Sequence, residues 1–207
     1  MKYPKIRELI EAVKALLTGP YTIKFPRKPI IPAKRFRGKP EYSNEGCIAC
    51  AACALVCPAR VIEFRDTVTK DKATRKMILH LDECHYCGQC SALCTTKEDN
   101  PPGIKHTTKF DLAGYDRAKM VSETEEKELA LCEICGDVIT AKAHLEWLVK
   151  KLGPLAFSNP TLFISSLKSM HFSQDVLQAA GDAAITRADR MKILCAKCKR
   201  KTTIERT

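Results

Sequence analysis

Apolar residues near the start of the chain recur with the period of an α-helix. Within residues 5–17 they stand on one helical face, at Ile6, Leu9, Ile10, Val13, Leu16 and Leu17. The pair Gly19 and Pro20 ends this pattern. A helix of about thirteen residues is only marginally stable alone. We therefore expect its apolar face to pack on a partner protein or at a membrane interface, with its own domain as the alternative.

The next segment, residues 20–45, contains five prolines. Proline excludes a helix interior and favours an extended, polyproline-like backbone. Short apolar pairs, Ile23 with Phe25 and Ile30 with Ile31, recur along it. This pattern predicts a strap that lies along a neighbouring surface, since a free linker rarely carries such anchors.

Two later segments have the alternation of β-strands, Val61–Phe64 and Met77–Leu81. They predict a hairpin whose connection, Arg65–Lys76, is polar and exposed. Pro101, Pro102 and Gly103 interrupt the chain. Helical patterns follow at residues 118–131, with Ser122 and Glu125 as a predicted capping box, and at residues 139–151, 160–170 and 174–184.

Eight of the twelve cysteines repeat one spacing. Cys47, Cys50, Cys53 and Cys57 form the run C-x2-C-x2-C-x3-C, which Pro58 follows, and the same run recurs at Cys84, Cys87, Cys90 and Cys94. This is the run of bacterial two-cluster ferredoxins, in which the fourth cysteine ligates the other cluster. We therefore expect one 4Fe–4S cluster on Cys47, Cys50, Cys53 and Cys94, and a second on Cys84, Cys87, Cys90 and Cys57.

Disulfides and zinc are the alternatives for these eight cysteines. Disulfides need an oxidising compartment, which a secretory signal would indicate. The N-terminal apolar residues do not form such a signal, because charged residues interrupt them. Zinc sites favour pairs of C-x2-C over a triple followed by a fourth cysteine. The chain also has no run of about eighteen apolar residues that would span a bilayer. We expect a reducing, cytoplasmic location.

The remaining cysteines, Cys132, Cys135, Cys195 and Cys198, form two C-x2-C pairs. Four thiolates are the ligand set of structural zinc or of a single rubredoxin-like iron. We expect one shared site. The insertion between the two pairs is long, but the entropic cost of closing a loop grows only slowly with its length. Separate uses of the two pairs, or free thiols, are the alternatives. Zinc is the metal we expect, with a single Fe as the alternative.

Charge is distributed unevenly. The net charge of +11 arises at the two ends, because residues 1–40 carry +9, residues 186–207 carry +6 and the middle carries −4. Basic ends suit an anionic membrane surface, an acidic partner or nucleic acid, and a solvated basic surface without a partner is the alternative. We expect no nucleic acid, because the basic tail lacks interleaved aromatic residues. A zinc-containing nucleic-acid-binding protein remains an alternative.

The combination of these segments resembles a known family. The residues that carry the resemblance are Thr22–Pro26 and Phe36–Glu41 of the strap, the two cysteine runs and the C-terminal pairs. They resemble the two-cluster ferredoxin-like iron–sulfur subunit of energy-converting (group 4) nickel–iron hydrogenases, formate hydrogenlyase and respiratory complex I. The sequence departs from this family at Thr95, where the family usually has proline.

The resemblance implies an electron-transfer subunit with no catalytic site of its own. It implies hydrogenase-like large and small subunits, a membrane-anchoring subunit and an electron-input partner in one complex, peripheral on the inner face of the cell membrane. A subunit of a soluble cytoplasmic oxidoreductase complex is the alternative. The first run is surrounded by small residues, whereas the second contains polar ones. This difference indicates that the reduction potentials of the two clusters differ.

The expected fold class is α+β, a bacterial two-cluster ferredoxin fold with an extended N-terminal helix and strap and a C-terminal helical metal-knuckle domain. Four parts follow from the patterns. They are the amphipathic helix and basic docking strap (1–42), the two-cluster ferredoxin domain (43–103), a connector (104–131) and the metal-binding region of four cysteines with its helical insertion and basic tail (132–207).

Overall fold

The computed structural model describes residues 5–172 and 185–204. The chain divides into two compact units, Met1–Lys34 and Arg35–Thr207. The helix expected at 174–184 lies outside the described residues. No helix among the described residues has the length and apolar character that crossing a membrane requires.

The first unit contains helix α1, Ile6–Thr18, where the apolar period predicts a helix. The Glu8 carboxylate accepts a hydrogen bond from the Lys5 backbone N–H at 3.0 Å, which satisfies one of the free donors at the helix start. Gly19, at a φ of 72°, ends the helix. No residue of α1 is buried, and its apolar stripe is exposed along its whole length.

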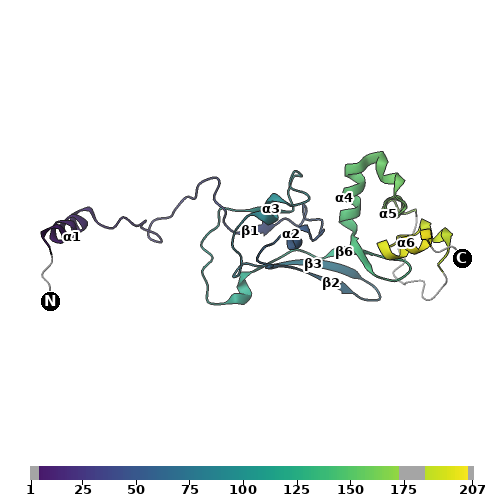
Figure 1. Cartoon of the computed structure of the whole chain (residues 1–207), viewed down its shortest axis with the longest axis horizontal. Coiled ribbons are helices and arrows are strands. Elements are labelled where there is room, and N and C mark those ends of the chain that lie inside the picture. Colours follow the sequence, from purple (N-terminus) through teal and green to yellow (C-terminus); the bar gives the residue numbers. More distant parts are fainter. Residues whose placement is uncertain (1–4, 173–184, 205–207) are drawn as a thin grey trace. The chain divides into compact units, whose positions relative to one another are not determined.

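The second unit is built on an antiparallel sheet in the order β2-β3-β6-β7, with β5 also paired to β3 (Figure 1). These strands are β2 (Ile62–Val68), β3 (Ala73–His80), β5 (Val121–Glu123), β6 (Lys127–Leu131) and β7 (Val138–Ala141). A separate pair joins β1 (Pro40–Tyr42) to β4 (Ile104–His106). Met77, Leu79, Ile104 and Leu129 are almost fully buried in the core that the sheet shares with the cysteine loops.

The predicted hairpin is confirmed, with Ile62 opposite Leu79, but its strands are longer than expected. The connection predicted as exposed is mostly strand, and Thr74 and Arg75 within it are buried. A charged residue is tolerated there because its charge is paired. The Arg75 guanidinium donates to both carboxylate oxygens of Asp66, at 2.6 and 2.7 Å.

The helix predicted at 118–131 is wrong. The segment forms a short 3-10 turn, η1 (Arg117–Met120), followed by β5 and β6, so Ser122 and Glu125 form no capping box. Strand pairing with β3 and β7 determines the outcome, because it buries Leu129 and Ala130 in the sheet. Tertiary pairing of this kind overrides a weak helical pattern.

Helix α4 (Lys142–Leu152) packs beside β6 and β7, and α5 (Pro160–Ser169) packs on α4 (Figure 1). The pattern at 139–151 becomes β7 and then α4, whereas the predicted helix at 160–170 is confirmed as α5. Ala130 of β6 packs in a small core with Leu145 of α4 and Leu162 of α5. The same region contains η2 (Gly153–Ser158), η3 (Arg187–Met191) and α6 (Ala196–Ile204).

Candidate iron–sulfur and metal sites

The two cysteine runs share one backbone conformation. In each, the residue two after the first cysteine has a positive φ, 49° at Ala49 and 53° at Tyr86. The residue after the second cysteine does too, 63° at Ala51 and 83° at Gly88. Three of these four are not glycine, and a positive φ costs such residues roughly 1–2 kcal/mol each. Strain repeated at equivalent positions indicates a functional requirement on both loops.

A short helix follows each loop and carries its third cysteine. These helices are α2 (Ala52–Leu55), which contains Cys53, and α3 (Gln89–Ala92), which contains Cys90. Cys57 follows α2 and Cys94 follows α3. The fourth cysteine of each run therefore lies beyond the helix, away from the loop that carries the first three. The two helices contact each other, so the runs lie side by side with the fourth cysteines exchanged.

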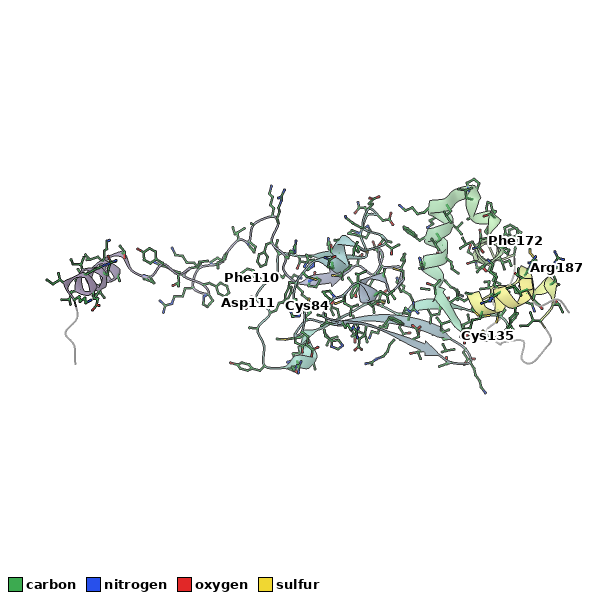
Figure 2. All side chains as sticks on the ribbon, in the orientation of Figure 1. Cys84, Phe110, Asp111, Cys135, Phe172 and Arg187 are labelled. Atoms are coloured by element: carbon green, nitrogen blue, oxygen red, sulfur yellow. The ribbon has the colours of Figure 1, made fainter. Side chains whose placement is uncertain are left out.

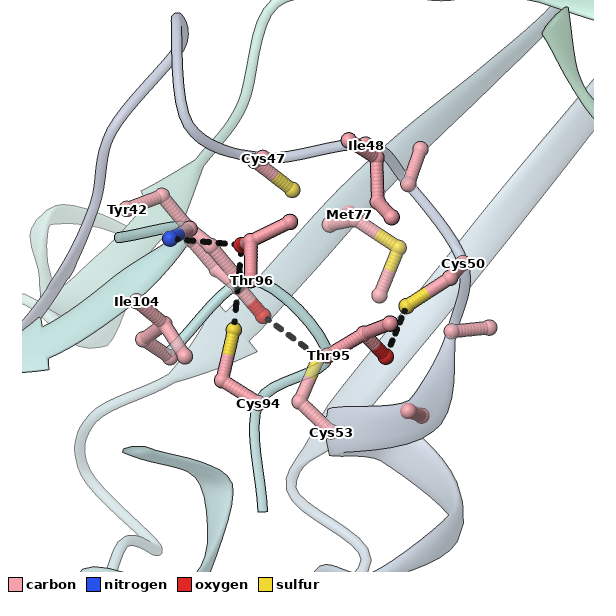
Figure 3. Close-up of a pocket in the computed structure, with 14 residues that line it drawn as sticks. Tyr42, Cys47, Ile48, Cys50, Cys53, Met77, Cys94, Thr95, Thr96 and Ile104 are labelled. Atoms are coloured by element: carbon pink, nitrogen blue, oxygen red, sulfur yellow. Dashed lines mark hydrogen bonds between the residues drawn. The ribbon is translucent and has the colours of Figure 1, made fainter. Parts of the chain in front are cut away.

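The first cavity is lined by sulfurs from both runs. It encloses about 310 Å³, partly open to solvent, and its wall includes Cys47, Cys50 and Cys53 of the first run together with Cys94 of the second (Figure 3). Its other lining residues are mostly apolar, with Met77 and Ile104 from the core. The structure thus brings together the four cysteines predicted for the first cluster.

The second cavity repeats this arrangement with the runs exchanged. It encloses about 360 Å³, partly open to solvent, and four of its lining residues are the cysteines predicted for the second cluster, Cys84, Cys87, Cys90 and Cys57. His106 of β4 also lines it. The His106 Nδ1–H donates to the Gly38 carbonyl at 2.8 Å, whereas its Nε2 is buried without a hydrogen-bond partner among the described residues.

Burial disfavours free thiolates in both cavities. It raises the pKa of the Cys53 thiol to about 12, against the lowering effect of the Tyr42 hydroxyl, and that of the Cys90 thiol to about 11. These thiols therefore keep their protons at neutral pH unless a metal cation takes the place of the proton. Four sulfurs on a mostly apolar wall fit a sulfide-rich metal cluster.

The remaining four cysteines meet at one point, at the end of the sheet away from the ferredoxin loops. Figure 2 shows Cys135 there, far from Cys84. The four Sγ atoms all lie within 4.8 Å of one another, and those of Cys135 and Cys195 are 3.6 Å apart. Ligands about 2.3 Å from a tetrahedral metal are about 3.8 Å from each other. The site fits a single tetrahedral ion, and a cubane cluster would need its sulfurs farther apart.

Local structure explains why these cysteines converge. Cys132 and Cys135 occupy the turn between β6 and β7, where Gly136 turns the chain at a φ of 74° and donates to the Cys132 carbonyl at 2.8 Å. Cys198 lies in α6. Ile134 and Leu194 are buried beside the sulfurs and form most of the small core there.

The Cys132 thiolate is stabilised before any metal binds. Burial raises its pKa, but backbone N–H groups of Cys135, Cys195 and Ile134 have the larger combined effect and lower its pKa to about 7. Backbone N–H donors that converge on one sulfur stabilise its negative charge. They therefore favour a metal site with several thiolates, which together carry a large negative charge. The donor set and its surroundings therefore fit zinc or a single iron.

Several residues at the first two sites are not evident from the cysteine spacing. Arg37 donates to the Cys87 carbonyl at 2.7 Å, and Arg75 donates to the Ala49 carbonyl at 3.2 Å. The Tyr42 hydroxyl lies 3.7 Å from Cys53 Sγ. These residues come from β1, β3 and the segment before β1, so only the tertiary fold brings them to the loops. The one sequence signal for them is the segment Phe36–Glu41 of the family resemblance, which contains Arg37.

Known proteins share the cysteine-rich region of this chain. A family profile described as 4Fe-4S dicluster domain matches residues 46–97. Formate hydrogenlyase subunit 6 of Escherichia coli (strain K12) is 30% identical over 139 residues, which are 67% of this chain and 73% of that protein. NAD(P)H-quinone oxidoreductase subunit I of Gloeobacter violaceus is 30% identical over 128 residues, which are 55% of this chain.

Coverage differs among the relatives. The chain spans 59% of the Gloeobacter violaceus protein, and 93% of NADH-quinone oxidoreductase subunit I 2 of Geobacter metallireducens at 29% identity. A chain in the structure of the membrane-bound sulfane sulfur reductase, an archaeal respiratory membrane complex, is 26% identical with a TM-score of 0.38. That match covers 58% of this chain and 61% of the other.

Proposed function

Because this chain belongs to the family of iron–sulfur subunits that includes formate hydrogenlyase subunit 6, we propose that it relays single electrons through two 4Fe–4S clusters within a membrane-associated oxidoreductase complex. Such a complex is hydrogenase-like or formate hydrogenlyase-like. The observation that carries the proposal is the pair of cavities, each lined by three cysteines of one run and the fourth cysteine of the other.

The residues that would hold the clusters are the eight cysteines of the two runs. When bound, each 4Fe–4S cluster supplies a site that takes up and releases one electron. The chain fixes the distance between the two sites, because α2 and α3 pack against each other and each run contributes cysteines to both cavities. Arg37 and Arg75 hold the two loops in place through their carbonyls. No proton transfer or substrate pocket is needed for this relay.

The C-terminal cysteines, Cys132, Cys135, Cys195 and Cys198, would hold one structural zinc, with a single iron as the alternative. Their distance from the ferredoxin loops supports a structural role. The ion would close the β6–β7 turn onto α6 and so fix the helical region to the sheet.

Metal analysis tests the proposed function directly. For protein purified without oxygen we expect about eight irons, about eight sulfides and about one zinc per chain, from the ligand counts. Reduction should produce the EPR signals of two interacting clusters. About four irons per chain would contradict the two-cluster relay, and about nine irons without zinc would assign the C-terminal site to iron.

The relatives support a place in a complex of several subunits. Subunits of quinone oxidoreductases and of formate hydrogenlyase are among them. We propose that the chain is peripheral on the cytoplasmic face, beside hydrogenase-like large and small subunits and a membrane-anchoring subunit, with a separate partner supplying electrons. Helix α1 would provide the attachment, since its apolar stripe is fully exposed and its other face is charged.

The attachment can be tested with two matched substitutions in α1. Ile10→Glu places a charge on the apolar stripe, whereas Ala15→Glu places the same charge on the opposite face. In cells that make the whole complex, we expect Ile10→Glu to move most of the protein to the soluble fraction and Ala15→Glu to leave it with the membranes. Equal behaviour of the two variants would contradict a role for the stripe. Wild-type protein found only in the soluble fraction would favour a soluble oxidoreductase complex.

A further inference from the structure

Hydroxyl groups surround the sulfurs of the first cavity. Three lie within hydrogen-bonding distance of a cysteine sulfur, as Figure 3 shows: Thr95 Oγ1 is 3.1 Å from Cys50 Sγ, Thr96 Oγ1 is 3.5 Å from Cys94 Sγ and the Tyr42 hydroxyl is 3.7 Å from Cys53 Sγ. A cysteine that ligates iron has no S–H, so in each pair only the hydroxyl can donate.

Each hydroxyl has one proton, and this decides which of the three donate to sulfur. The Thr96 hydroxyl donates to the Gly46 carbonyl at 2.9 Å and accepts from the Gly103 N–H at 3.0 Å. Its proton is therefore committed to the buried backbone. Among the described residues, the hydroxyls of Thr95 and Tyr42 have no hydrogen bond other than those to Cys50 and Cys53. Both are therefore donors to sulfur.

The second cavity differs in this respect. Tyr86 lines it, and the Tyr86 hydroxyl donates to the Leu81 carbonyl at 3.5 Å and not to a sulfur. The donors to sulfur there are backbone N–H groups, among them that of Tyr86, 3.4 Å from Cys84 Sγ. Within the described part of the chain, side-chain hydroxyl donors thus reach the ligand sulfurs of the first cavity alone, although the second run has the more polar sequence.

Burial also differs between the two sites. Cys47 and Cys53 of the first set are buried, whereas Cys87 of the second is exposed. A buried cluster resists the extra negative charge of reduction, because its surroundings stabilise that charge poorly. Hydrogen-bond donors to the sulfurs of such a cluster make reduction easier, because their hydrogen bonds strengthen as the sulfurs become more negative.

We propose that Thr95 and Tyr42 tune the first cluster, raising its reduction potential against the effect of its burial. The inference rests on the proposed function, since it requires the cluster to be present. The two hydroxyls act through Cys50 and Cys53 and do not touch iron.

Redox titration of the full chain, followed by EPR, tests the inference. Thr95→Val keeps the shape of the side chain and removes the hydroxyl, and Thr95→Ser retains the hydroxyl as the matched control. At a fixed ambient potential we expect Thr95→Val to lower the reduced-to-oxidised ratio of the first cluster about tenfold, a shift of about 59 mV for one electron. Thr95→Ser and the second cluster should stay unchanged. Tyr42→Phe should give a smaller shift in the same direction, because its hydroxyl is farther from sulfur.

Iron content separates the two possible failures. About eight irons and two EPR signals must first be found in the unaltered protein, and their absence would overturn the proposed function. If both clusters are present in Thr95→Val and Tyr42→Phe, and the first cluster's midpoint is unchanged in both, the tuning role is wrong. Should Thr95→Val fail to load, Tyr42→Phe and Thr95→Ala carry the same test.

Discussion

Replacing Cys94 with serine should remove the cluster of the first cysteine run and leave the cluster of its own run in place. Cys94 lines the cavity of Cys47, Cys50 and Cys53, and not the cavity of Cys84, Cys87 and Cys90. Loss of one thiolate from a four-ligand set leaves an iron without its strong ligand. We expect iron to fall from about eight to about four per chain, with one of two EPR signals lost.

Matched variants give this experiment its control. Cys94→Ser and Cys47→Ser should lose the same signal, although they lie in different runs. Cys57→Ser and Cys84→Ser should lose the other. If Cys94→Ser and Cys84→Ser lost the same EPR signal, each run would hold its own cluster. The exchange of cysteines between the cavities argues against that result.

Replacing Cys198 with serine should release the C-terminal metal and loosen residues 132–207 without emptying the two clusters. The core around this site is small, and Ile134 and Leu194 are its main buried apolar residues besides the cysteines. In the proposed site, metal binding would therefore supply much of the local folding free energy, of the order of 10 kcal/mol for structural zinc sites. We expect zinc to fall from about one to below about 0.2 per chain.

Limited proteolysis and metal analysis together measure this effect. Cleavage should become fast within residues 132–207, while iron stays at about eight per chain. Lys197→Ser is the control, because Lys197 is exposed between the two C-terminal cysteines and offers no ligand. Retention of zinc in Cys198→Ser would contradict the shared site, as would loss of zinc in the control.

The cysteine spacing carried most of what could be predicted about the sites. It predicts three ligands per loop and a fourth exchanged between runs, because two intervening residues keep the first three cysteines on one loop and three more residues carry the fourth beyond it. The alternating apolar residues also predict the β2–β3 hairpin, which is confirmed. Both features are local in sequence.

The errors arose where contacts between distant segments decide the structure. Residues 127–131 have enough apolar residues for a helix, but pairing with β3 and β7 makes them a strand. Arg75 reads as exposed, but Asp66 and the Ala49 carbonyl satisfy its guanidinium in the interior. The residues within the runs indicate only that the two potentials differ, whereas the hydroxyls that reach sulfur belong to Tyr42 and Thr95, outside the runs.

Residues 37–42, which include β1, matter for how the protein is divided. The matched family profile begins at residue 46, and the first cysteine is Cys47. Yet Arg37 reaches the Cys87 carbonyl, the Gly38 carbonyl holds His106 and Tyr42 reaches Cys53. The contacts that hold the two cysteine loops therefore begin at Arg37, ahead of the matched profile. Substitutions in residues 37–42 would change the surroundings of either cysteine set while leaving every cysteine in place.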